Sequence, residues 1–425
     1  MRLSAIVLSI FIASAVNAQV DSTQLYYSKA REAYKAGSYG EFYSIISRAY
    51  RLNPYHPALS YQAAVAASLT GRAEEAISML RKTLHENAKA DLTNPDLAAV
   101  ARTPRFAELQ NLQTRLLETV ISSDTAFMIP DRTLHVESIA AGETYGIFYG
   151  ASIHKAKIIR IDVHGRVSDF TSQSQDGLTS VFAVKVDRKK NILWACSSPM
   201  AEMEERPANA MSAVFMYDIG TKKLLRKFYP PGAAQREFIF GDLILDAAGN
   251  AYVSDSKNNH IFRVNESADT LELFYTASQF WNIQGITFDD KGKFLFIADY
   301  IKGIFRLDVK SKLLTRLEPK FEFSTKSIDG LIFHKKKLIA IQNYIQPMRV
   351  VAFTLGRDYR TLESCTLIDK AHPAFNEPTN GCLYGDTLYY VANSLWSGYT
   401  DDRRLKPADQ LVNPVILKVD LGRVR

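Results

Sequence analysis

The sequence contains little cysteine and few histidines, and both scarcities exclude certain kinds of site. Only three of the 425 residues are cysteine, so at most one disulfide can form and a disulfide-based scaffold is excluded. All three (Cys196, Cys365 and Cys382) lie in apolar, strand-like segments, where a buried free thiol is the usual case. The eight histidines are not spaced as a metal-binding set, which argues against zinc. Ser254 and Ser394 lack the Gly-x-Ser-x-Gly context of a serine hydrolase.

Long hydrophobic runs are absent after the first residues. The apolar run from Leu3 to Ala15 follows the positive Arg2 and is shorter than the roughly 20 residues that a membrane-spanning helix needs. It ends in Val16-Asn17-Ala18, a small-residue pattern after which a signal peptidase can cut. We therefore predict a signal peptide over residues 1–18 and an exported protein, periplasmic or secreted. A membrane anchor is the alternative for this run, and no later membrane span is expected.

The charge of the chain is moderately positive and spread along its length. The sequence has 52 Lys and Arg against 45 Asp and Glu, a formal net charge of +7. The densest basic run, Lys335 to Lys337, is typical of a solvated hairpin turn. This distribution indicates solubility and does not predict a nucleic-acid partner.

The first part of the mature chain has helical periodicity and a short internal repeat. Between Gln24 and Val120 the apolar residues recur at helical spacing. Gly37 and Gly71 open two similar segments and lie 34 residues apart, the period of tetratricopeptide repeats, which this module resembles over about two units. Such a module is either a structural adaptor or a groove for a protein partner. We predict it over residues 19–122.

The sequence pattern changes from helical to strand-like near Ser123. Beyond it, short apolar strands recur in six groups at intervals of about 45 residues, the length of a four-stranded propeller blade. The repeated Asp-x-x-Gly turns at Asp246 and Asp289 support this reading. The last group has only three strands before the sequence ends. Residues 126–129 are a further strand-like segment that belongs to none of the six groups. We therefore expect this segment to close the last blade. The fold class is α+β multidomain: the helical module followed by an all-β six-bladed propeller over residues 123–425.

Propellers bind ligands where the inner strands open on the central channel. The residues that begin each predicted first strand carry carboxylates in three of the six groups (Glu137, Asp242 and Asp329). Because each precedes an apolar strand, their side chains are expected to point towards one axis. The aromatic and amide residues expected around this mouth are Tyr149, Asn343, Asn393, Trp396 and Tyr399. Each aromatic residue has packing between blades as its alternative role.

The propeller half resembles the senescence marker protein/gluconolactonase family, with NHL-repeat and strictosidine synthase-like relatives. The resemblance covers Thr133 to about Leu421 and rests on Val136 to Ala140, Gln284 to Ile286, Ile297 to Tyr300 and Ile328 to Leu331. In that family a Glu, an Asn and an Asp hold a divalent cation. The resemblance implies a metal site at Glu137, Gln284 and Asp329, with calcium favoured. Glutamine replaces the family's asparagine, but its carbonyl oxygen still suits Ca²⁺.

The same resemblance implies a lactonase-like hydrolase of small esters. Asp329 or Asp242 would then be the general base, and Tyr149, Asn343 and Asn393 would contact a small polar ligand or lactone. Two other readings remain open, since one fold hosts many functions. One is a propeller that binds a ligand without turnover. The other is an interaction scaffold whose helical module holds a protein partner.

Overall fold

The computed structural model describes residues 25–54 and 57–424, and the predicted signal peptide lies outside them. Contacts divide the chain into two compact units. One contains the described residues up to Glu118 together with residues 345–347, and the other contains the remaining residues from Thr119 on. Among the described residues, no helix combines the length and the apolarity needed to cross a membrane.

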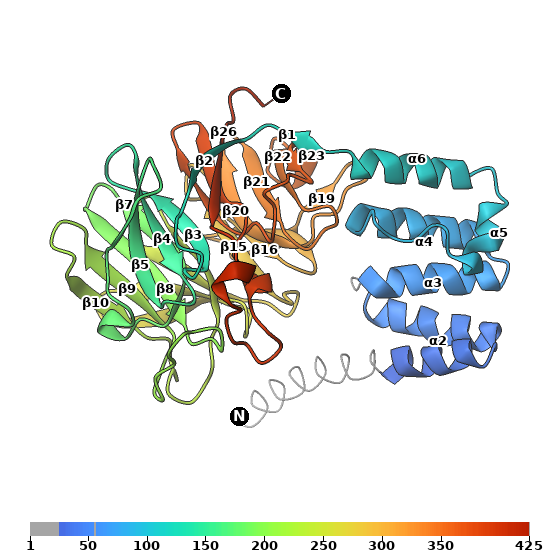
Figure 1. Cartoon of the computed structure of the whole chain (residues 1–425), viewed down its shortest axis with the longest axis horizontal. Helices are drawn as coiled ribbons and strands as arrows, with labels where there is room; N and C mark the ends of the chain where they lie inside the picture. Colours follow the sequence, from blue (N-terminus) through green and yellow to red (C-terminus); the bar gives the residue numbers. More distant parts are fainter. Residues whose placement is uncertain (1–24, 55–56, 425) are drawn as a thin grey trace. The chain divides into compact units, whose positions relative to one another are not determined.

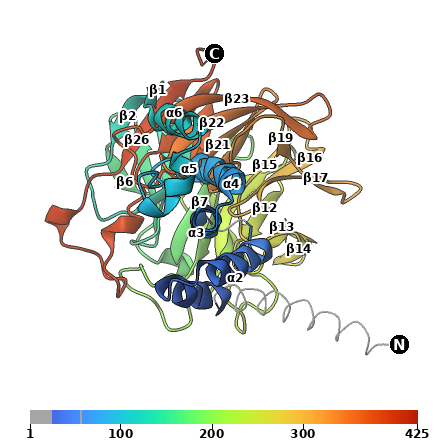
Figure 2. The same cartoon turned by 90° about the vertical axis from the view of Figure 1, so that its right-hand side faces the viewer.

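The first unit is a stack of antiparallel helices (Figure 2). Gly37 and Gly71 both have left-handed backbone angles, with φ of 71° and 75°, a conformation that glycine adopts without steric cost. Each therefore turns the chain from one helix into the next, which explains the repeat of 34 residues. Residues 25–35 are helical and are followed by α2 (Tyr39–Leu52), α3 (Pro57–Leu69), α4 (Ala73–Glu86), α5 (Ala98–Ala101) and α6 (Phe106–Leu117), with a short 3-10 turn, η1 (Pro95–Leu97).

The second unit is a six-bladed propeller, as predicted (Figure 1). The four main strands of each blade pair antiparallel. The innermost strand of each blade contacts the next around the axis until the sixth returns to the first. The first three blades are β3 (Val136–Ala141), β4 (Ile147–Ser152), β5 (Lys157–Asp162) and β6 (Val167–Asp169); β7 (Ser180–Asp187), β8 (Ile192–Ser198), β9 (Ala213–Asp218) and β10 (Leu224–Phe228); β11 (Phe240–Leu245), β12 (Ala251–Asp255), β13 (His260–Asn265) and β14 (Thr270–Thr276).

The last two blades each include a strand from the beginning of this unit. A short strand preceding the propeller adds to the fifth blade, and the next strand closes the sixth. The fourth, fifth and sixth blades are β15 (Ile283–Phe288), β16 (Phe294–Asp299), β17 (Gly303–Asp308) and β18 (Leu314–Arg316); β20 (Ile328–His334), β21 (Lys337–Gln342), β22 (Arg349–Leu355) and β23 (Thr361–Lys370), with β1 (Val120–Ile121) and β19 (Glu318–Pro319); β24 (Gly381–Tyr384), β25 (Thr387–Val391), β26 (Val415–Asp420) and β2 (Asp124–Met128).

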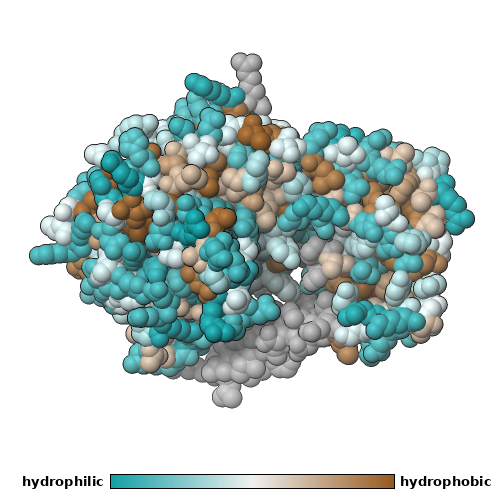
Figure 3. All heavy atoms as spheres, viewed as in Figure 1, coloured by the Kyte–Doolittle hydropathy of each residue, from teal (hydrophilic) through white to brown (hydrophobic). Residues whose placement is uncertain are grey.

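The blades are held together by apolar clusters between their faces. Trp194 and Phe228 of the second blade pack in one cluster with Phe240 and Phe262 of the third. Polar residues predominate on the face that Figure 3 shows, with apolar residues scattered among them. The core is thus distributed around the ring, as expected when each blade buries its faces on its neighbours.

The predicted closure of the sixth blade is confirmed. Strand β2 pairs antiparallel with β26, the last strand of the chain. Phe127 on β2 is 6 % exposed, and its ring lies 5.3 Å from that of Phe148 in the first blade. The closing strand therefore covers an edge and also fills the interface between the last blade and the first.

We predict that Phe127→Ala destabilises the propeller by about 3 kcal/mol, the usual cost of truncating a buried phenylalanine. The matched control is Met128→Ala, one residue further along β2 where the side chain is 56 % exposed, and it should cost under about 0.5 kcal/mol. Urea unfolding followed by tryptophan fluorescence measures both, since all three tryptophans lie in the propeller. Equal midpoints for the two variants would contradict the closing role of β2.

Candidate functional site

One cavity of about 460 Å³ opens where the inner strands begin. It contains five of the residues predicted from the sequence, together with side chains from loops that join the blades. Its wall is formed by Glu137, Phe182, Met200, Ile239, Gly241, Ser256, Lys257, Asn282, Gln284, Tyr300, Asp329, Asn343, Glu377 and Trp396.

The inner strands share a local irregularity that positions these residues. In β3 the pairing skips from Val136 to Ser138, so Glu137 lies outside the ladder. The same shift removes Gln284 from the ladder of β15 and Asp329 from that of β20. A β-bulge redirects the side chain of the unpaired residue. Because the bulge recurs at the start of successive inner strands, residues far apart in sequence reach the same cavity.

Two carboxyl groups line this cavity, that of Glu137 buried and that of Asp329 half-buried. Glu137 is 7 % exposed, and its Oε2 accepts a hydrogen bond of 3.0 Å from the indole Nε1 of Trp396. Burial raises the pKa of Glu137 to about 8. Burial and the neighbouring charge of Glu137 raise the pKa of Asp329 well above its ordinary value. Both groups thus favour a proton or a cation at neutral pH.

Asp329 is held by a chain of two hydrogen bonds. Asn343 donates from Nδ2 to Asp329 Oδ2 over 2.7 Å, and the hydroxyl of Tyr300 donates to Asn343 Oδ1 over the same distance. Burial raises the pKa of Tyr300, so its hydroxyl stays protonated and keeps donating. This chain fixes the orientation of the carboxyl group, and it places the predicted ligand residue Asn343 at the site.

Gln284 lies on the same wall with its amide oriented by two neighbours. Its Nε2 donates to Asn282 Oδ1 over 2.8 Å, and Ser256 donates to its Oε1 over 3.3 Å. The contact to Oε1 is long for a hydroxyl donor. The carbonyl oxygen therefore retains the capacity to accept or coordinate a further group.

Sequence reasoning missed three residues at this site. Glu377 comes from the loop before β24, where Ser397 N donates to its Oε2 over 3.1 Å, and burial raises its pKa. Tyr300 was noted only as part of a motif. His135 precedes the bulge of β3, is fully buried and lies 3.7 Å through Nε2 from Glu137 Oε2. Burial lowers the pKa of His135 to about 3, so it is a neutral neighbour of the glutamate.

The predicted base Asp242 lies in the same ring of strands but outside this cavity wall. It is 1 % exposed, and its carboxylate accepts from Leu243 N, Ile286 N and Asn380 Nδ2 at 2.8, 3.2 and 3.0 Å. Lys185 approaches it to 3.6 Å. The structure therefore gives Asp242 a role in tying neighbouring inner strands together.

Two predicted ligand residues, Tyr149 and Asn393, do not line the cavity. Tyr149 is 1 % exposed, packs edge-on against Phe170 and donates to Glu143. Asn393 donates to Asn413 O and accepts from Val415 N. The first packs within the blade layer, and the second fastens a loop to β26.

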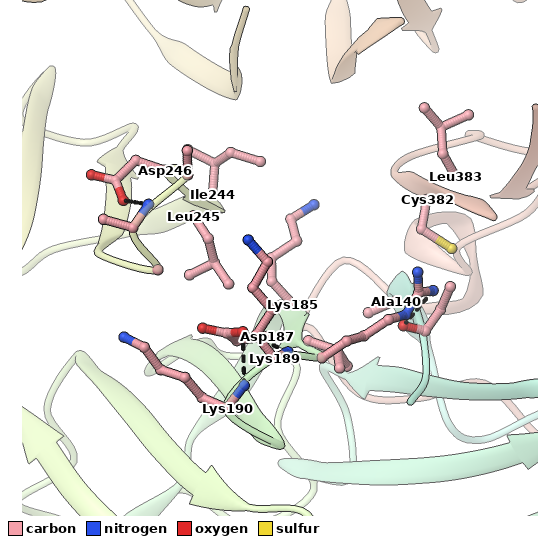
Figure 4. Close-up of a pocket in the computed structure, with 16 residues that line it drawn as sticks. Ala140, Lys185, Asp187, Lys189, Lys190, Ile244, Leu245, Asp246, Cys382 and Leu383 are labelled. Atoms are coloured by element: carbon pink, nitrogen blue, oxygen red, sulfur yellow. Dashed lines mark hydrogen bonds between the residues drawn. The ribbon is translucent and has the colours of Figure 1, made fainter. Parts of the chain in front are cut away.

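The opposite ends of the inner strands form a different cavity, of about 430 Å³. Figure 4 shows Lys185, Lys189 and Lys190 beside it, all from one segment of the second blade. The carboxylate of Asp187 accepts from the backbone N–H groups of Lys189 and Lys190 and so belongs to the turn. One mouth of the channel is therefore acidic and the other basic.

No group of three or more Asp, Glu, His or Cys side chains is arranged as a ready-made metal cluster within the described part of the chain. The candidate set consists instead of two carboxylates and the amide of Gln284. One carboxylate oxygen of Glu137 and one of Asp329 accept a hydrogen bond within the protein. Two carboxylates with an amide carbonyl form the oxygen-only donor set that Ca²⁺ takes, so the residues present fit a hard cation.

We predict that the metal-stripped protein loses stability as the pH rises from 4.5 to 8. Glu137 keeps its proton in the folded state up to a pKa of about 8, against an ordinary value of 4.5, so unfolding releases a proton across this interval. Glu137→Gln removes that contribution and should flatten the fall, whereas the exposed control Glu266→Gln should not. Thermal unfolding in a chelator at pH 5 to 9 measures the slopes. An unchanged slope for Glu137→Gln would contradict the burial of this charge.

No protein-family model matches the sequence, and no curated protein sequence matches it. The three solved structures that follow each align with it at 12 % sequence identity. A PQQ-bound aldose sugar dehydrogenase from Streptomyces coelicolor matches 71 % of this chain and 98 % of its own, with a TM-score of 0.47. XC5397, a gluconolactonase from Xanthomonas campestris, matches 70 % of this chain and 88 % of its own, with a TM-score of 0.45. A chain of a nidogen/laminin complex matches 66 % and 90 %, with a TM-score of 0.45.

Proposed function

We propose that the acidic mouth of the propeller binds a divalent cation, Ca²⁺ in preference, through Glu137, Gln284 and Asp329, and that the bound site hydrolyses lactones or related small esters. The observation that carries the proposal is the recurrence of the bulge, which brings these three oxygen-bearing side chains to one cavity. The hydrolytic part rests on the family resemblance of the sequence.

The electrostatics of the cavity favour a cation. Asp329 is subject to the charges of Glu137, Asp242 and Glu377, all of which raise its pKa. Lys257, the one lysine on the cavity wall, forms an ion pair with Glu237. A divalent cation would replace the protons that otherwise neutralise these groups.

The residues of the site combine a candidate cation site with a carboxylate beside it, two groups that ester hydrolysis can use. A cation bound there would polarise an ester carbonyl and lower the pKa of a water molecule. Asp329, oriented by Asn343, would accept a proton from that water. Tyr300 holds Asn343 in turn, and Trp396 fixes the carboxyl group of Glu137.

A second candidate function is ligand binding without turnover. The observation that favours it is the state of Asp242, whose carboxylate is already engaged by three N–H donors. This leaves Asp329 as the only one of the two proposed bases that lines the cavity. In this version the cation presents a small polar ligand instead of activating it.

We further propose that the protein is exported, to the periplasm or beyond the cell. Export would suit a calcium site of modest affinity, because extracellular calcium-binding modules work with Kd values of about 10⁻⁴ to 10⁻³ M. The helical module would then serve as an adaptor or hold a protein partner, which stays a prediction from its repeat pattern.

Calorimetric titration of metal-stripped protein with Ca²⁺ tests the proposal. Asp329→Asn should weaken binding by more than roughly tenfold, about 1.4 kcal/mol, because it removes one of two charged ligands. Gln284→Asn should leave the affinity unchanged or raise it. The control Asp308→Asn changes a carboxylate in a turn at the far end of β17 and should have no effect.

The outcomes separate the two candidate functions. If neither Ca²⁺, Mg²⁺, Mn²⁺ nor Zn²⁺ binds with a Kd below about 1 mM, the cation site is wrong. If Ca²⁺ binds but gluconolactone and aryl esters are not hydrolysed in its presence, the hydrolase assignment fails for these substrates and ligand binding without turnover stands.

A further inference from the structure

The acidic cavity adjoins a second and larger one. This second cavity has a volume of about 770 Å³. Met200, Ile239, Lys257 and Trp396 belong to the walls of both cavities. The two cavities therefore adjoin one another at these four residues.

The second cavity is built from two long loops of the propeller, those before β9 and before β11. Met200, Met211, Phe238 and Ile239 give it apolar walls, together with small alanines. Methionine side chains adapt to ligands of varied shape. We name this second cavity the apolar groove.

Charged groups also line the apolar groove. Of its carboxylates, Glu202 accepts a hydrogen bond of 2.9 Å from Arg403, and Glu237 is paired with Lys257. The two arginines that also line it, Arg206 and Arg236, form no ion pair with the carboxylates of the described residues. The charge of Arg206 helps to lower the pKa of the Glu237 carboxyl group, but neither guanidinium group is taken up by an ion pair. Both are therefore available to a ligand, and guanidinium is the group best suited to bind a carboxylate.

We propose that the ligand of this site is an acyl compound with an ester or lactone at one end and a carboxylate at the other. Its ester end lies at Glu137, Gln284 and Asp329, its hydrocarbon chain lies along Met211 and Phe238, and its carboxylate is bound by Arg206 and Arg236. This deepens the proposed function and rests on it for the ester end. The chain and carboxylate contacts are independent of the cation.

Fatty acids test the groove without any need for hydrolysis. Metal-stripped protein titrated with hexanoate, octanoate and decanoate should bind more tightly with each added methylene, by up to about fourfold where the methylene is fully buried, which corresponds to 0.8 kcal/mol. Decanol, which lacks the carboxylate, should bind at least roughly tenfold more weakly than decanoate.

Variants locate the binding. Met211→Asp should abolish decanoate binding, because it places a like charge on the apolar wall, and the control Leu225→Asp adds the same charge on the exposed strand β10 and should leave it intact. Arg206→Gln combined with Arg236→Gln should weaken decanoate at least tenfold and leave decanol unchanged. Circular dichroism checks that Met211→Asp is folded, and the arginine pair provides an independent test.

The results distinguish this proposal from the cation site. If decanoate binds as described and Ca²⁺ does not, the groove stands and the ester end of the assignment falls. If Ca²⁺ binds but decanoate does not, or if decanoate binds with no dependence on chain length or on the two arginines, the groove is wrong and the cation site is unaffected.

Discussion

The candidate site depends on the bulge at the start of the inner strands. Pairing with the second strand of the blade holds β3, β15 and β20 in the ring, while the skipped residues leave the ladder. The same shift occurs in β7 at Phe182 and in β11 at Gly241 and Asp242. A regular ladder would alternate every side chain between the two faces of the blade. The bulge instead frees one side chain from this alternation. The side chains freed in β3, β15 and β20 reach the same cavity.

Convergence has an electrostatic consequence along the channel. Carboxyl groups gather at the mouth where the inner strands begin, and lysines gather where they end. Asp242 lies on an inner strand between these groups, tied by backbone N–H groups and approached by Lys185. Buried like charges oppose folding unless protons or cations neutralise them. The acidic mouth therefore combines a cost in stability with a capacity to bind cations.

Much of the architecture could be predicted from the sequence because it repeats. Recurring strands and the Asp-x-x-Gly turns indicate a propeller, and the carboxylate of Asp246 does accept from the N–H groups of Ala248 and Asn250 at 2.9 Å. Glu137, Gln284 and Asp329 were predictable for the same reason, since each begins an inner strand. The repeat also predicted that a strand just before Pro130 closes the last blade. This strand, β2, ends at Met128.

The remaining site residues follow from features that a repeat does not encode. Glu377 lies in a loop and reaches the cavity with a left-handed backbone, φ 60°. Tyr149 was expected at the mouth, but it lies on the second strand of its blade and packs against Phe170. Asp242 occupies the predicted position, yet hydrogen bonds that no sequence pattern reveals satisfy its carboxylate.

The central claim is that Glu137, Gln284 and Asp329 share one cation. Crystals grown with Mn²⁺, which prefers the same oxygen ligands, would test it through anomalous scattering at the manganese absorption edge. The account predicts one strong peak in the cavity within about 2.5 Å of an oxygen of each of the three side chains, a coordination distance for a hard cation. A cavity without a peak, or a peak held by other residues, would contradict it.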